Sequence, residues 1–138
     1  MFRDHRQVAY ALMRLALGIN IFGHGFFRIH SGLGAFAAGM AAGMDKGPLP
    51  HALSLGFGYV VPFVETFVGV LLLLGLWTRC ALVGGSIFML ALTFGTTSVQ
   101  NWPTAGTQLM YSFVFFALLW LVDVNGYSLD GWLSRRGK

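Results

Sequence analysis

Apolar residues dominate four long stretches of the chain, and most polar residues lie between them. These stretches cover residues 8–29, 55–76, 80–98 and 107–124. A helix of about 20 apolar residues crosses the roughly 30 Å hydrocarbon core of a bilayer. The pattern therefore predicts an all-α fold in which one membrane domain, residues 1–138, forms an integral four-helix bundle.

The first connection, residues 30–54, has a helical pattern of its own. In the segment SGLGAFAAGMAAGM, small residues recur every fourth position beside a row of Phe36, Met40 and Met44. This spacing predicts a short interfacial or re-entrant helix over residues 33–44. The tail, residues 125–138, places Leu129 and Trp132 on one face and is expected to lie on the membrane surface.

Composition supports a membrane protein and indicates its orientation. The chain is 56% hydrophobic and only 10% charged, with a net charge of +4. Most basic residues lie beside the N-terminus, in the connection between the second and third spans, and beside the C-terminus: Arg3, Arg6, Arg79, Arg135, Arg136 and Lys138. By the positive-inside rule both termini are cytoplasmic, and we expect the inner membrane of a prokaryote. The lipid bilayer is then the expected partner, and no basic face suited to nucleic acid is present.

Polar residues on the first span share one face. Arg14, Asn20, His24 and Arg28 fall within a sector of about 120° at 100° per residue. The second span carries Glu65 near its midpoint, and an unpaired charge there costs several kcal/mol. We therefore predict a buried polar network in which Glu65 pairs with Arg14 and Asn20 is a hydrogen-bonding neighbour, although such a pair can also serve only to fix helix register.

The remaining donors of the first span predict a ligand site. His24 and Arg28 lie on adjacent turns toward the outer leaflet, near Gln108 and Tyr111 of the fourth span. Two such donors suit the oxygen of a quinone, a lipid phosphate or a small oxyanion. At the inner surface, a structural pair between Arg79 and Asp123 is expected.

Metal and thiol chemistry have weaker support in the sequence. His30, Met40, Met44 and His51 offer soft ligands suited to Cu(I), but packing is the favoured role of the two methionines, and no metal site is predicted. His24 is the one histidine within the four predicted spans, so this chain alone is not expected to hold haem through two axial histidines. A single cysteine, Cys80, disfavours a dithiol relay.

Several motifs together resemble the DoxX/DoxD family of small four-helix membrane proteins. They are an Arg early in the first span, HG..R at its end, a Glu within the second span, and GVLLLLGLWTR. The matching positions are Arg14, His24, Gly25, Arg28, Glu65, Gly69, Gly75, Thr78 and Arg79. The likeness extends to the closing DVNGYSLDGWL and so covers almost the whole chain.

This resemblance implies a function in membrane redox chemistry. DoxD is a subunit of a thiosulfate:quinone oxidoreductase, and the present chain differs by having no DoxA-like region. The first hypothesis is therefore a subunit of a membrane redox system that binds quinone between the first two spans. If it is an enzyme, it belongs to a quinone-linked oxidoreductase. The alternative is a non-catalytic accessory or assembly subunit of a larger membrane complex.

Overall fold

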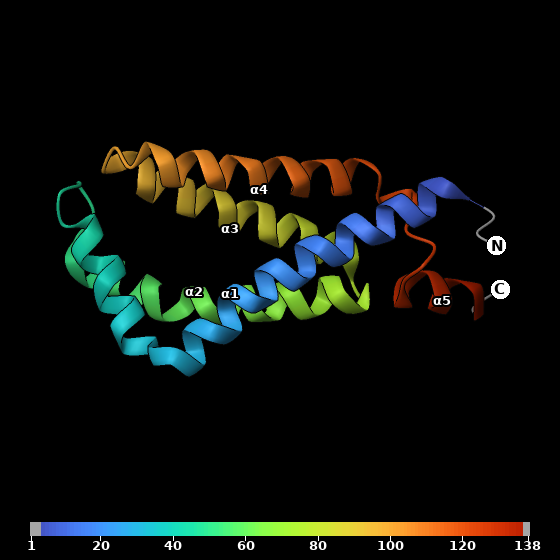
Figure 1. Ribbon diagram of the computed structural model, residues 1–138, viewed down its shortest axis with the longest axis horizontal. Helices are drawn as coiled ribbons and strands as arrows, with labels where there is room; N and C mark the ends of the chain where they lie inside the picture. The colour runs from blue at the N-terminus through green and yellow to red at the C-terminus, as the bar shows by residue number, and fades with distance from the viewer. Residues whose placement is uncertain (1–3, 137–138) are drawn as a thin grey trace.

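A computed structural model describes residues 4–136, and their regular secondary structure is entirely helical (Figure 1). The elements are α1 (His5–Met44), α2 (His51–Leu74), α3 (Thr78–Ser98), α4 (Trp102–Trp120), a 3-10 turn (Val122–Val124) and α5 (Leu129–Arg136). The predicted all-α fold is confirmed. Arg3 and Lys138, which entered the topology argument, lie outside the described residues, as does the end of the tail at 137–138.

The four long helices form two hairpins, α1 with α2 and α3 with α4 (Figure 1). The connections 45–50 and 99–101 lie at one end of the molecule. The two ends of the described chain lie at the opposite end, together with α5. The hydrophobic core joins all four helices through residues such as Leu17, Leu72, Leu82 and Phe115.

Helix α1 extends well beyond the predicted span and bends at Gly32. This glycine has φ 130° and ψ 77°, a backbone region that side chains with a Cβ rarely enter. Residues 33–44 are helical and form a second arm of α1, which bends against α2 and continues toward the end of the molecule that holds the connection 45–50 (Figure 1). Ala37, fully buried, packs so closely on Gly58 that a Cβ there would lie 2.8 Å from the Ala37 Cα. The arm is therefore anchored on α2, whereas Gly39 is exposed and a Cβ there would meet nothing within 4 Å.

Glycines set the register of α1 against α2. A Cβ at Gly69 would lie 2.5 Å from the backbone nitrogen of Phe22, and one at Gly25 would strike the Pro62 carbonyl. A Cβ at Gly18 would lie 3.1 Å from Leu73. Small residues are common where membrane helices approach each other closely. These contacts place Gly25 beside the middle of α2 and Gly18 beside its C-terminal end.

Two helices, α2 and α3, are long and apolar enough by length and composition to cross a membrane. The predicted spans 8–29 and 107–124 fall largely within α1 and α4, which do not meet that measure because polar residues interrupt them. All four long helices nevertheless expose large apolar side chains, among them Ile19, Phe67, Leu90 and Phe113.

The C-terminal segment is tied to the turn between α2 and α3. The Asp130 carboxylate accepts hydrogen bonds from the backbone nitrogens of Trp77 (2.9 Å) and Thr78 (2.8 Å). It thereby caps the N-terminus of α3, where donor groups lack helical partners. The Asn125 amide donates to the Thr78 hydroxyl at 2.9 Å. These bonds hold α5 against the end of the helices at which the described chain starts and stops.

Candidate functional site

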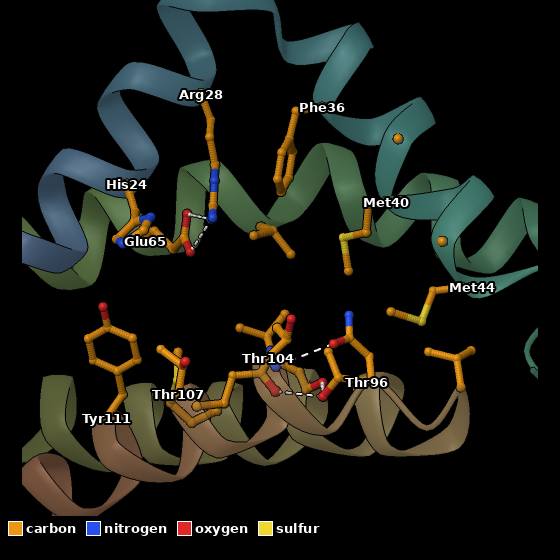
Figure 2. Close-up of a pocket in the computed structure, with 18 of the residues that line it drawn as sticks. His24, Arg28, Phe36, Met40, Met44, Glu65, Thr96, Thr104, Thr107 and Tyr111 are labelled. Atoms are coloured by element: carbon orange, nitrogen blue, oxygen red, sulfur yellow. Dashed lines mark hydrogen bonds and ion pairs between the residues drawn. The ribbon is translucent and has the colours of Figure 1, made fainter.

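A cavity of about 530 Å³ lies between the two hairpins, with residues of all four long helices in its lining (Figure 2). The prediction of a pocket between the first two spans is corrected by this lining, because α3 and α4 form one of its walls. One wall comes from both arms of α1 and from α2, and the opposite wall comes from α3 and α4. His24, Thr104 and Thr107 line it and are exposed, so the cavity communicates with the surface. All four residues of the predicted ligand site line this one cavity: His24, Arg28, Gln108 and Tyr111.

An ion pair forms part of the first wall. Nη1 of Arg28 lies 2.5 Å from Oε1 and 2.6 Å from Oε2 of Glu65. The ring of Phe36, on the second arm of α1, lies 4.5 Å from the guanidinium carbon, so the cation is held between a carboxylate and an aromatic face (Figure 2). The Glu65 side chain is only 6% exposed, whereas that of Arg28 is 29% exposed. The pair neutralises its own charges while Arg28 stays accessible from the cavity.

The predicted pairing of Glu65 with Arg14 is wrong. Arg14 is buried at the C-terminal end of α2, where it donates to the carbonyls of Leu72, Leu73 (3.3 Å) and Tyr127 (2.8 Å). The last carbonyls of a helix lack helical donors and carry partial negative charge, which a guanidinium satisfies. The prediction failed because it assumed that the first two spans are centred at equal depth, whereas α1 is displaced along α2 by the glycine contacts and continues past residue 29.

Asn20, on α1, contacts α4 rather than Glu65. Its Oδ1 accepts a hydrogen bond from the Tyr111 hydroxyl at 3.0 Å, which joins α1 to α4. The Tyr111 ring meets the His24 ring edge-on, with centroids 6.3 Å apart. The predicted trio of Arg14, Asn20 and Glu65 is thus divided among three places in the fold.

Two cavity side chains have unused hydrogen-bonding capacity. Oε1 of Gln108 accepts from the Thr96 hydroxyl at 2.7 Å, which leaves the amide nitrogen as a donor. Within residues 4–136, the imidazole of His24 makes no hydrogen bond to another side chain or to the backbone. A ligand oxygen in the cavity would find donors on both of its walls.

The sequence analysis did not identify two further hydroxyls of the cavity. Thr104 and Thr107 line it together with Gln108 and Tyr111, all on α4. The four residues follow the i, i+3, i+4, i+7 spacing of one helical face. That periodicity was visible in the sequence and is the signal that would have found them.

The proposed copper ligands do not gather around one point. Met40 and Met44 line the cavity, but His30 and His51 do not. His30 stacks on Phe26, with ring centroids 4.1 Å apart, and Nδ1 of His51 lies 2.7 Å from the Asp45 carboxylate. Among residues 4–136, no group of three or more His, Cys, Asp or Glu residues is arranged to hold a metal ion.

At the opposite end of the molecule, the structure brings Arg79 and Asp123 together. Nη2 of Arg79 lies 2.5 Å from Oδ1 of Asp123, and both side chains are largely exposed. Solvent screens such a pair, so it contributes little to stability. Cys80, next in sequence, is exposed.

Comparisons with known proteins place the chain in a family. Neither the curated proteins nor the solved structures include a match to it. The family model described as DoxX matches residues 9–98. That segment holds α1 from its second turn through the whole of α2 and α3, including His24, Arg28 and Glu65. Together with the apolar helices, the match indicates a membrane protein, and the chain belongs to the DoxX family.

Proposed function

We propose that this chain is a multi-pass membrane protein that binds a quinone in the cavity between its two hairpins, as a subunit of a membrane redox system. One observation carries the proposal. Unused donors on His24 and Gln108 face one cavity from opposite walls, beside an ion pair that balances its own charge.

The exposed apolar faces support four membrane spans. Large apolar side chains are exposed on each long helix: Leu12, Ile19 and Phe27 on α1, Phe63 and Phe67 on α2, Ile87, Leu90 and Phe94 on α3, and Leu109, Phe113 and Phe116 on α4. Soluble proteins rarely expose so much contiguous apolar surface, whereas lipid chains require it. Arg79, Arg135 and Arg136 lie at the end where the described chain starts and stops, which favours both termini on the cytoplasmic side of a prokaryotic inner membrane.

The charge balance of the cavity favours a neutral ligand over an anion. Arg28 alone would attract a phosphate or a small oxyanion, but Glu65 already receives two of its contacts and cancels its charge. A quinone is neutral and offers two carbonyl acceptors on opposite edges of its ring, which suits donors on opposite walls. His24 and Gln108 supply such donors.

Equilibrium binding to purified protein tests the proposal. A benzoquinone with a short side chain is titrated against the native protein, His24→Ala and Gln108→Ala, with bound ligand followed by intrinsic tryptophan fluorescence. Loss of one hydrogen-bond donor is expected to weaken binding about tenfold. His30→Ala is the matched control, because His30 is on the same helix but outside the cavity. Equal affinities for the native protein and the two cavity variants would refute the site.

The wider redox role needs a separate measurement. The resemblance to DoxD points to thiosulfate as the electron donor, with a partner subunit delivering the electrons. Membranes that contain the chain and its partners are expected to reduce quinone when thiosulfate is added, and to lose this activity with His24→Ala. Activity that is unchanged by His24→Ala would separate the reaction from this cavity.

The alternative, an accessory subunit without a ligand, is supported by an exposed glycine outside both cavities. Gly84 on α3 is exposed, and a Cβ there would meet nothing within 4 Å. Exposed glycines permit close approach of another membrane helix. Native mass measurement after mild-detergent extraction distinguishes the two: a stable complex that forms equally well with His24→Ala and holds no quinone favours the accessory role.

A further inference from the structure

A second, smaller cavity adjoins the first and differs from it in chemistry. Its volume is about 190 Å³, and it lies between the second arm of α1, α2 and α3. Ser54 is the one hydroxyl-bearing residue in a lining that is otherwise apolar or glycine: Met40, Met44, Leu49, Leu53, Phe57, Ala91, Leu92, Phe94 and Gly95. The polar donors of the first cavity are absent from this lining.

The two cavities share Met40, Met44 and Leu92. Both methionines extend from the second arm of α1 toward the space between the hairpins (Figure 2). A methionine side chain has three rotatable bonds and no branch, so it repacks around a neighbouring group at low cost. The shared wall is therefore made mainly of adaptable side chains, and rotation of the two methionines is the movement that would open one cavity to the other.

The second cavity also reaches the outer surface of the helices. Three residues of its lining are exposed there, Leu53 from α2 with Ala91 and Phe94 from α3. In a bilayer this surface faces lipid chains. The path thus runs from the polar donors of the first cavity, past two methionines, to the lipid-facing surface between α2 and α3.

From this geometry we infer that the ligand of the first cavity carries a long apolar tail, and that the tail leaves through the second cavity between α2 and α3. The inference rests on the proposed quinone site and specifies its ligand class: an isoprenoid quinone held by its head, with its tail in a dedicated channel. Gly95 leaves this channel open. A Cβ added there would lie 3.6 Å from the sulfur of Met44, and a larger side chain would occupy the second cavity.

The test combines two ligands with two variants. The ligands are a benzoquinone without a tail and the same ring with a long isoprenoid tail. Gly95→Leu fills the channel, and Gly84→Leu is the matched control on the same helix, where a Cβ meets nothing within 4 Å. Gly95→Leu is expected to weaken binding of the tailed quinone by about tenfold or more while the tailless quinone binds as it does to the native protein. Gly84→Leu is expected to change neither affinity.

The outcomes separate the inference from the proposed function. If Gly95→Leu weakens both ligands equally, or weakens neither, the tail does not use this channel, although the head site can still stand on the His24→Ala result. If the native protein binds neither quinone, both proposals fail. Thermal unfolding in detergent tests whether Gly95→Leu is folded. Crosslinking from a diazirine on the quinone tail gives a readout that needs no variant, and in the native protein it is expected to reach α2 or α3. Crosslinks confined to α4 would overturn the inference.

Discussion

The ion pair of Glu65 with its partner forms part of the cavity wall. A double-mutant cycle measures the coupling free energy between the two side chains directly. The structure pairs Glu65 with Arg28. Replacing Arg28 by Met removes the cation and leaves a carboxylate whose side chain is 6% exposed. Breaking a buried pair in this way costs about 3–5 kcal/mol.

The other single change and the double change have smaller expected costs. Glu65→Gln keeps an acceptor for Arg28, whose side chain is 29% exposed and still contacts Phe36, so the cost is about 1–2 kcal/mol. The double variant leaves neither charge unpaired and is expected to be at least about 2 kcal/mol more stable than the sum of the two losses.

A control cycle combines Arg14→Met with Glu65→Gln, two changes at side chains that do not contact each other in the structure. Arg14→Met is expected to destabilise by about 3 kcal/mol, because three carbonyl contacts at the end of α2 and at Tyr127 lose their donor. Combined with Glu65→Gln, its effect is expected to add within about 0.5 kcal/mol, since the two groups have no shared partner. The free energy of unfolding is measured by SDS titration in mixed micelles. Additivity for Arg28 with Glu65, or coupling for Arg14 with Glu65, would refute the helix register described above.

Three further outcomes are expected. Gly25→Ala places a methyl group against backbone atoms of α2 and should cost about 1–3 kcal/mol of unfolding free energy, whereas Gly23→Ala, with nothing within 4 Å, should cost none; equal stabilities would contradict the close contact. Arg79→Met removes an exposed ion pair with Asp123 and should change the free energy of unfolding by less than about 1 kcal/mol in the same titration; a larger loss would show that the pair is not screened. Cys80 is exposed near the proposed cytoplasmic end, so a membrane-impermeant maleimide should label it in inverted vesicles and not in intact spheroplasts; the reverse result would invert the proposed topology.

Local information in the sequence was sufficient for the helices. Long apolar runs and the small-residue spacing of residues 33–44 depend on neighbours a few positions apart, which is why the all-α class and the helical arm could be predicted. The same holds for the residues of the cavity: His24 and Arg28 share a face of α1, and Gln108 and Tyr111 share a face of α4. Both pairs follow from helical periodicity alone.

The tertiary structure decided which side chains meet across helices. Periodicity gives a residue's angle around its own helix but not its height relative to a neighbour. The height of α1 along α2 depends on where Gly25 and Gly69 let the two backbones approach. The bend at Gly32 then places the ring of Phe36 beside the guanidinium of Arg28. Arg14 and Arg28 lie about four helical turns apart on α1, and the height of α1 against α2, which leaves no local pattern in the sequence, decides which of them meets Glu65. The sequence by itself determined the helices and their polar faces, and only the packing of one helix on another determined the ion pair and the cavity it borders.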